Sequence, residues 1–127
     1  MSMINSTLIN YIIRKGELYI MRKITFTKTE HNGVECWKDE TGLFMVKKRL
    51  GHYGEKPQFD LFIAKRDCSQ LTNECHSWGY EELYKGFESK EDTIYEVKII
   101  INYIFNSISL ELFNDYQYKL IYDTYFE

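Results

Sequence analysis

The chain has 127 residues, of which 44% are hydrophobic, 17% are aromatic and 28% are charged, and its formal net charge is −3. This length corresponds to one domain, and the apolar content is sufficient for a hydrophobic core. Disordered, collagen-like and coiled-coil chains have different compositions. We therefore expect a single small soluble α+β domain.

Residues 1–20 form an N-terminal segment whose relation to the domain has two interpretations. Asn10 interrupts its apolar residues, and Arg14 and Lys15 follow, so it has neither the apolar run of a signal peptide nor the roughly 20 residues of a membrane span. Residues 14–21 match the translation of a purine-rich bacterial ribosome-binding sequence that leads into a start codon at Met21. Residues 1–20 are then an extension upstream of a domain at 21–127. The alternative, which we weigh equally, is that residues 1–20 form a helix or strand docked on that domain.

From residue 22 the hydrophobic pattern has a period of two, which is typical of half-buried strands. Strands are predicted within residues 22–31, 34–37, 43–49 and 59–64, with turn signals that include Asn32-Gly33 between them. The connections are short, which predicts an antiparallel meander, since parallel strands need long crossovers. Residues 75–78 and 83–85 could add a fifth and a sixth strand.

Two helices are predicted after the sheet. Ser89 followed by Asp92 matches a capping box, and the helix behind it should run to about Asn106. A second helix is expected from Leu110 to about Phe126, with its N-cap within residues 107–109. The predicted fold is thus an antiparallel meander of four to six strands with two C-terminal helices packed on the sheet.

The first predicted helix has apolar residues on more than one side. One stripe, which includes Val97 and Ile101, would face the sheet, and a second contains Tyr95, Ile99 and Tyr103. The helices and the N-terminal segment could cover the surplus within one chain. The alternative is a protein interface, where tyrosine is enriched. We expect a homodimer with the C-terminal helices at its interface.

Charge is distributed unevenly along the chain. Residues 21–66 contain ten Lys or Arg and six acidic residues, whereas residues 67–127 contain four and twelve. The sheet is therefore predicted to be basic and the helical side acidic.

Cations and aromatics near the third and fourth strands suit a phosphate-bearing ligand. These candidate residues are Lys47, Lys48, Arg49, His52, Tyr53 and Lys56. The simpler interpretation is that lysines protect a sheet edge from aggregation, and the pI of 5.7 is low for a nucleic-acid binder. If phosphate binds, Lys48→Glu combined with Arg49→Glu should abolish binding and leave the fold intact.

The acidic and tyrosine-rich side is the other candidate surface, and it would face a basic partner protein. Its residues are Glu91, Asp92, Tyr95, Glu96, Tyr118 and Tyr122.

Catalytic and metal motifs are not recognisable in the chain. Cys36, Cys68 and Cys75 lack the paired spacing of zinc sites, and their odd number is unlike a secreted disulfide scaffold. We therefore expect a cytoplasmic protein that is not an enzyme and has no cofactor, no metal and no membrane contact.

Three functional hypotheses follow from these features. The first is a stoichiometric antagonist carried by a phage or plasmid, directed against a host defence nuclease or toxin in the manner of an anti-CRISPR or immunity protein. The frequent Lys, Ile, Asn and Tyr, which use AT-rich codons, agree with such an origin. The second is an oligomeric protein that sequesters a nucleotide or a nucleic-acid phosphate at the basic loop. The third is a housekeeping domain that only self-associates.

Overall fold

The computed structural model of the chain describes residues 23–31, 33–66, 79–105 and 112–126. The elements are β1 (Phe26–His31), β2 (Val34–Asp39), β3 (Phe44–Arg49), β4 (Gln58–Ala64), β5 (Tyr80–Phe87), α2 (Lys90–Phe105) and α3 (Asp115–Tyr125). The strands form one antiparallel sheet of order β1-β2-β3-β4-β5. This confirms the predicted α+β meander with two C-terminal helices. The expectations for residues 1–20 and 75–78 lie outside the described residues.

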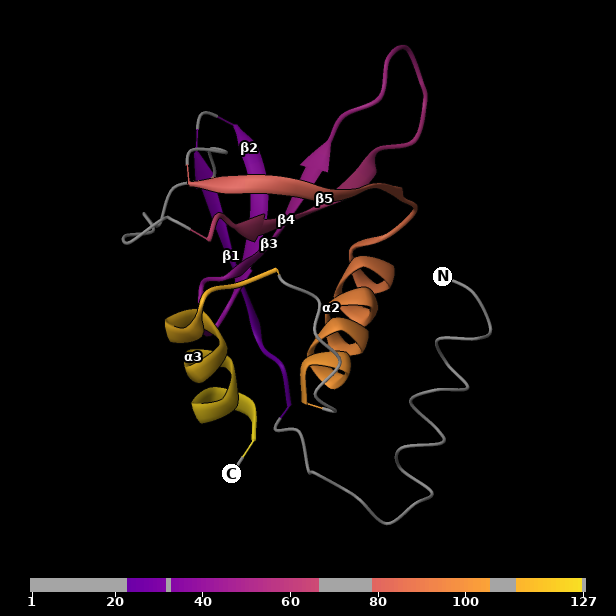
Figure 1. Cartoon of the computed structure of the whole chain (residues 1–127). Helices are drawn as coiled ribbons and strands as arrows, with labels where there is room; N and C mark the ends of the chain where they lie inside the picture. The colour runs from indigo at the N-terminus through magenta and orange to yellow at the C-terminus, as the bar shows by residue number, and fades with distance from the viewer. Residues whose placement is uncertain (1–22, 32, 67–78, 106–111, 127) are drawn as a thin grey trace, which may run out of the picture.

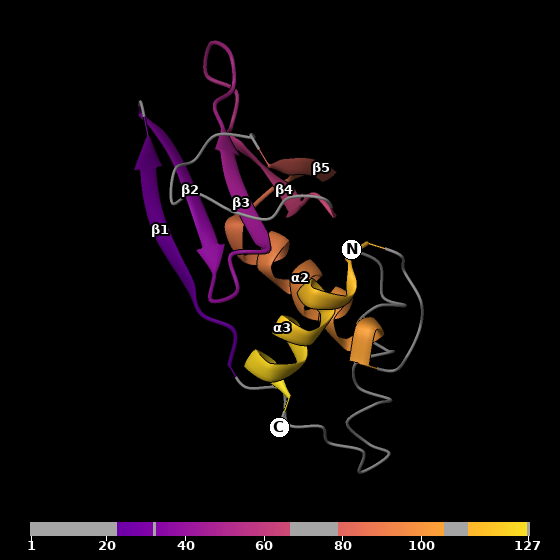
Figure 2. The same cartoon turned by 60° about the vertical axis from the view of Figure 1, so that its left-hand side comes forward.

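Both helices lie on one face of the sheet (Figures 1 and 2). On that face Phe44 pairs with Ile63 and Val46 pairs with Leu61, and all four side chains are buried. Phe44 also meets Phe113, which precedes α3, edge to face with 5.5 Å between the ring centroids. The main core therefore lies between the sheet and the helices, where apolar burial stabilises the fold.

The helix α2 starts as the sequence predicts. The N–H of Asp92 donates to the hydroxyl of Ser89 at 3.0 Å, and the carboxylates of the first turn complement the positive end of the helix dipole.

The second apolar stripe of α2 is largely covered. Ile99 is buried, and Tyr95 and Tyr103 are half-buried. Less apolar surface is therefore exposed on α2 than the sequence indicated. The part of α2 that could form the predicted homodimer interface is correspondingly smaller.

The helix α3 begins at Asp115 rather than at Leu110, because a second capping box sets its start. Asn114 Oδ1 accepts the N–H of Gln117, and Gln117 Oε1 accepts the N–H of Asn114, both at 2.8 Å. Gln117 Nε2 donates to the carbonyl of Lys65 at 3.0 Å, and Asn114 Nδ2 donates to the carbonyl of Arg66. The same two side chains thus cap the helix and attach it to the end of β4.

A buried carboxylate joins the sheet to the end of α3. Asp39 Oδ2 accepts the O–H of Tyr125 at 2.5 Å and that of Thr41 at 2.7 Å, while Oδ1 accepts the N–H of Phe44 at 3.0 Å. Burial raises the pKa of Asp39. Burial, followed by the nearby Asp39 charge, raises the pKa of Tyr125, so this phenol remains a proton donor.

Cys36 is fully buried in β2 and is disulfide-bonded. The hydroxyl of Thr29 lies 3.2 Å from its sulfur and is the donor, because a disulfide sulfur carries no proton. The other two cysteines lie outside the described residues. Disulfides persist mainly in oxidising environments, so the cysteine pattern no longer supports a cytoplasmic location.

Candidate functional site

The loop between β3 and β4 projects beyond the rest of the sheet (Figures 1 and 2). We call residues 50–57 the hairpin tip. Leu50 is 73% exposed and Tyr53 is fully exposed, and both are among the few large hydrophobic side chains that are exposed in the described ranges. Neighbouring exposed apolar side chains on a projecting loop are typical of an interaction surface.

The backbone of the hairpin tip is tightly folded. The N–H of Glu55 donates to the carbonyl of His52 at 3.0 Å, and the residues between them, Tyr53 and Gly54, have φ values of 39° and 79°. Positive φ at both positions is the pattern of a type I′ turn, which favours Asn-Gly. A tyrosine there is strained because its Cβ crowds the backbone. Gly51 is also required, since a Cβ at this position would lie 2.7 Å from the carbonyl oxygen of Glu55.

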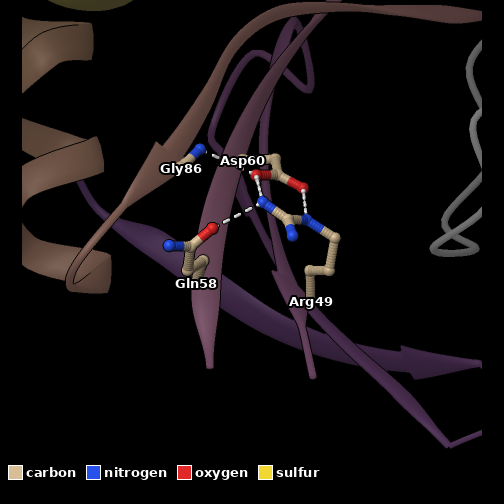
Figure 3. Close-up of polar contacts among 4 residues, drawn as sticks. All are labelled: Arg49, Gln58, Asp60 and Gly86. Atoms are coloured by element: carbon tan, nitrogen blue, oxygen red, sulfur yellow. Dashed lines mark hydrogen bonds and ion pairs between the residues drawn. The ribbon is translucent and has the colours of Figure 1, made fainter. Parts of the chain in front are cut away.

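Four residues at the base of the loop form a polar cluster that we call the hairpin brace (Figure 3). Arg49 Nε and Nη2 donate to Asp60 Oδ2 and Oδ1 at 3.0 and 3.3 Å. Arg49 Nη2 also donates to Gln58 Oε1 at 2.8 Å. Asp60 Oδ1 accepts the N–H of Gly86 at 3.0 Å, close to the register shift between β4 and β5. Bidentate pairing fixes the relative orientation of its partners, so the brace holds β3, β4 and β5 together beneath the tip.

The cations predicted to bind phosphate do not act as one cluster. Lys47 Nζ lies 5.8 Å from the ring centroid of Phe62. Arg49 belongs to the brace, where its hydrogen bond to Asp60 raises the pKa of the guanidinium. Lys48 points to the opposite face, as alternation along a strand requires. His52 and Lys56 are exposed on the tip.

A pocket of about 320 Å³ lies between the β1–β2 turn and the root of the hairpin. We call it the charged pocket; it is lined by Gly33, Val34, Glu35, Lys48 and Leu50. The carboxylate of Glu35 lies 3.3 Å from Lys28 Nζ and 3.6 Å from Lys48 Nζ. The hydrogen bond from Lys28 lowers the pKa of Glu35, so this carboxylate is ionised at neutral pH.

Exposed carboxylates lie at the start of α2. The last residue of β5 pairs with the start of β4, which directly follows the hairpin tip. Glu88, Glu91 and Asp92 come next in the chain, so they follow β5 at this end of the sheet. Glu96, one turn further along, is buried, and burial raises its pKa. The exposed acidic surface therefore contains the predicted Glu91 and Asp92 but excludes Glu96.

The tyrosines predicted for an interface on α3 use their hydroxyl groups inside the fold. Tyr118 Oη accepts the N–H of Leu112 at 3.2 Å, and Tyr122 Oη donates to the carbonyl of Ile104 at 2.9 Å. Both side chains are half-buried, whereas Tyr116 is 74% exposed. The helix buries Gln117 instead, because Gln117 binds the carbonyl of Lys65.

Three residues of this region were not anticipated from the sequence. Leu50 is an apolar residue that directly follows three cations and precedes a glycine, and this position was a usable signal for an exposed loop residue. Asp60 interrupts an apolar strand pattern, which signals a buried carboxylate in need of a partner. Glu35 gives no local signal, because its role depends on lysines from two other strands.

Comparisons of the chain with protein-family models, with curated proteins and with solved structures found no match. In the described ranges no three His, Cys, Asp or Glu residues are grouped as a metal site would require, and no helix there is long and apolar enough to cross a bilayer.

Proposed function

We propose that the chain is a small non-enzymatic binding protein that blocks a partner protein by inserting its hairpin tip into a cleft of that partner. The observation that carries this proposal is Tyr53, a fully exposed aromatic residue in a strained left-handed conformation at the end of a braced hairpin. Strain at an exposed tip does not stabilise the fold, so a strained and exposed tyrosine there favours a role in binding.

The physical properties of the tip suit an interface. Tyrosine supplies a large contact area with a polar end and is enriched among residues that dominate binding energy. The brace of Arg49 and Asp60 keeps the loop ordered before binding, which lowers the entropic cost of association.

The charges around the tip favour a basic partner. Glu55 and Lys56 balance each other within the tip, and exposed carboxylates follow at the start of α2. A nucleic-acid-processing protein has a basic substrate surface of this kind, and a host defence nuclease or toxin is the partner class we propose. The protein would then act as a stoichiometric antagonist carried by a phage or plasmid.

The alternative, binding of a nucleotide or nucleic-acid phosphate by the basic run, has less support. Arg49 is paired with Asp60, Lys48 with Glu35, and Lys47 covers an aromatic ring. A carboxylate beside each of two cations opposes the binding of a phosphate group.

The test is inhibition of purified or co-expressed defence nucleases and toxins by the intact protein. We expect one member of such a panel to be inhibited, and inhibition should be complete at one chain per target molecule. Tyr53→Asn should abolish inhibition without loss of stability, because Asn tolerates the left-handed conformation and completes an Asn-Gly turn. Tyr116→Ala, a change at an exposed tyrosine on α3, is the matched control and should inhibit normally.

Two results would contradict the proposal. Full inhibition by Tyr53→Asn would exclude the tip as the contact. Absence of inhibition across the panel, with a thermal shift produced by nucleotides, would favour the ligand-sequestering alternative.

A further inference from the structure

A row of charged side chains crosses three strands and ends at the edge of the sheet. Lys48 Nζ of β3 lies 3.6 Å from the carboxylate of Glu35 in β2, and that carboxylate lies 3.3 Å from Lys28 Nζ in β1. The sign of the charge thus alternates from strand to strand, and opposite charges on neighbouring strands stabilise a sheet. Lys28, whose side chain is 51% exposed, is the last member of this row. A carboxylate on a further strand would continue the alternation.

Glu30 is the carboxylate of this region that lacks a cation. It lies two residues after Lys28, so it projects to the same face of β1, and it is exposed. Its partner in the β1–β2 register is Glu35, and like charges in directly opposite positions destabilise a sheet. Within the described residues Glu35 pairs with two lysines, whereas Glu30 pairs with none. A cation on a further strand would therefore relieve Glu30.

β1 is an edge strand that another strand can extend. Among the described elements it pairs with β2 alone, and this pairing is regular from Phe26 to His31 (Figure 2). A regular edge presents a row of N–H and C=O groups to a further strand. The register of β5, the other edge strand, shifts twice against β4, and such irregularities hinder pairing between edges. β1 is therefore the edge better suited to an added strand.

The charges of β1 select one way of pairing this strand with a copy of itself. Opposite residues of antiparallel strands project to the same face, so the two-fold axis between identical strands must lie at a residue that faces itself. An axis at Lys28 or at Glu30 would bring like charges together. An axis at Thr29 places Lys28 opposite Glu30 of the second copy, and Glu30 opposite Lys28 of that copy. Only the last arrangement supplies both missing partners.

We propose that the chain forms a symmetric dimer in which β1 pairs antiparallel with β1 of a second copy about an axis at Thr29. The two five-stranded sheets then form one continuous sheet. Lys28, Glu30, Glu35 and Lys48 have a net charge of zero, so this edge favours a partner that carries both signs in the matching order, as a second copy does. β2 separates this edge from the strands of the hairpin, and the dimer therefore does not depend on the proposed function.

Sedimentation equilibrium of the intact protein tests the dimer. Pairing of two short edges buries less area than a standard interface, so we expect a dissociation constant on the order of 10–100 µM. Lys28→Glu and Glu30→Lys should each abolish the dimer, because each places two pairs of like charges across the axis. A wild-type protein that remains monomeric at about 1 mM, well above that range, would overturn the proposal.

A mixture of the two single variants distinguishes charge pairing from damage to the strand. In the mixed pair both carboxylates of Lys28→Glu face both ammonium groups of Glu30→Lys, so native mass spectrometry should detect a heterodimer. The combined variant Lys28→Glu with Glu30→Lys exchanges the two charges and should dimerise within about threefold of the wild-type dissociation constant. Absence of both dimers, with all variants folded by circular dichroism, would show that these charges do not meet.

Lys85→Glu is the matched control, because it makes the same charge change at an exposed residue of the other edge strand. It should leave the dimer unchanged. Loss of the dimer in this variant would assign the interface to β5 and overturn the proposal. A dimer that persists in both Lys28→Glu and Glu30→Lys would also overturn it and would favour the interface predicted on the C-terminal helices.

Discussion

Tyr125 shows how a single hydroxyl group can fix the end of a helix. Its O–H donates to Asp39, which is 5% exposed and belongs to a strand on the other side of the core. Without that donor the buried carboxylate would retain only the hydrogen bonds from Thr41 and Phe44. Loss of a partner by a buried charged group is costly, because solvent does not replace it.

We therefore expect Tyr125→Phe to lower the free energy of unfolding at pH 7 by about 1.5–3 kcal/mol, the range for hydrogen bonds to charged groups. Urea denaturation of the variant and of the wild type measures the difference. Tyr116→Phe removes an exposed hydroxyl and should change stability by less than about 0.5 kcal/mol.

The contact between Tyr125 and Asp39 also predicts how the stability of the fold depends on pH. The native pKa of Tyr125 is raised above the ordinary value near 10, so the unfolded chain loses this proton first as the pH increases. The group therefore contributes its stability below pH 10, and that contribution is lost as the pH rises above 10. The stability difference between wild type and Tyr125→Phe should narrow in that range. If the difference in free energy of unfolding between wild type and Tyr125→Phe stays constant up to pH 11, this interpretation is wrong.

At the level of elements, the hairpin brace explains why the tip is ordered. Asp60 accepts hydrogen bonds from both Arg49 and the backbone of Gly86, and it is 4% exposed. Asp60→Ala should lower the free energy of unfolding by about 1–3 kcal/mol, since a backbone donor and the guanidinium lose their acceptor. Denaturant unfolding tests this, with the exposed Asp123→Ala as the control. A loss no larger than that of the control would show that the brace does not stabilise the hairpin.

The brace also corrects an expectation about charge reversal. Lys48→Glu with Arg49→Glu is not neutral for the fold, because the second change places a carboxylate against Asp60. Loss of ligand binding in that double variant would not distinguish a destroyed site from a disturbed hairpin. Lys48→Met is a cleaner change, because Lys48 forms its ion pair with the partly exposed Glu35 and takes no part in the hairpin brace.

The start of α3 depends on Asn114, which both caps the helix and contacts the end of β4. Asn114→Ala should lower the free energy of unfolding by about 1–2 kcal/mol, because the first-turn N–H loses its acceptor. Asn114→Asp keeps that acceptor but places a carboxylate oxygen, in place of the Nδ2 donor, against the carbonyl of Arg66. If capping dominates, it should lose less stability than Asn114→Ala. Thermal unfolding of both variants separates capping from docking. Equal losses would show that the contact with Arg66 dominates.

At the level of the whole molecule, the disulfide bond of Cys36 predicts how many free thiols the chain has. The sequence contains three cysteines, and a disulfide uses two, so one free thiol per chain should remain. Thiol titration of the denatured protein should give one thiol without reductant and three after reduction. Reduction should also destabilise the fold by about 2–4 kcal/mol. Three reactive thiols in protein purified under oxidising conditions would contradict the disulfide.

The sequence by itself determined the features that depend on neighbouring residues. The period-two pattern and the Asn-Gly and Gly turn signals predicted the first four strands and their antiparallel order, and Ser89 predicted the start of α2. The sequence also placed His52 and Tyr53 in a loop, because they lie between the strands predicted within residues 43–49 and 59–64. β5 was only partly predicted, since Glu81, Glu82 and other exposed residues on this strand conceal the alternation.

Only the tertiary structure decided which charged groups are engaged and where α3 begins. Arg49 and Asp60 meet because of the β3–β4 register, and Glu35 meets Lys28 and Lys48 from the strands on either side. The start of α3 is fixed by carbonyl groups at the end of β4, roughly fifty residues earlier in the chain. Local periodicity reports which face a side chain occupies, but contacts between distant residues depend on strand register and helix docking, which single-sequence patterns do not encode.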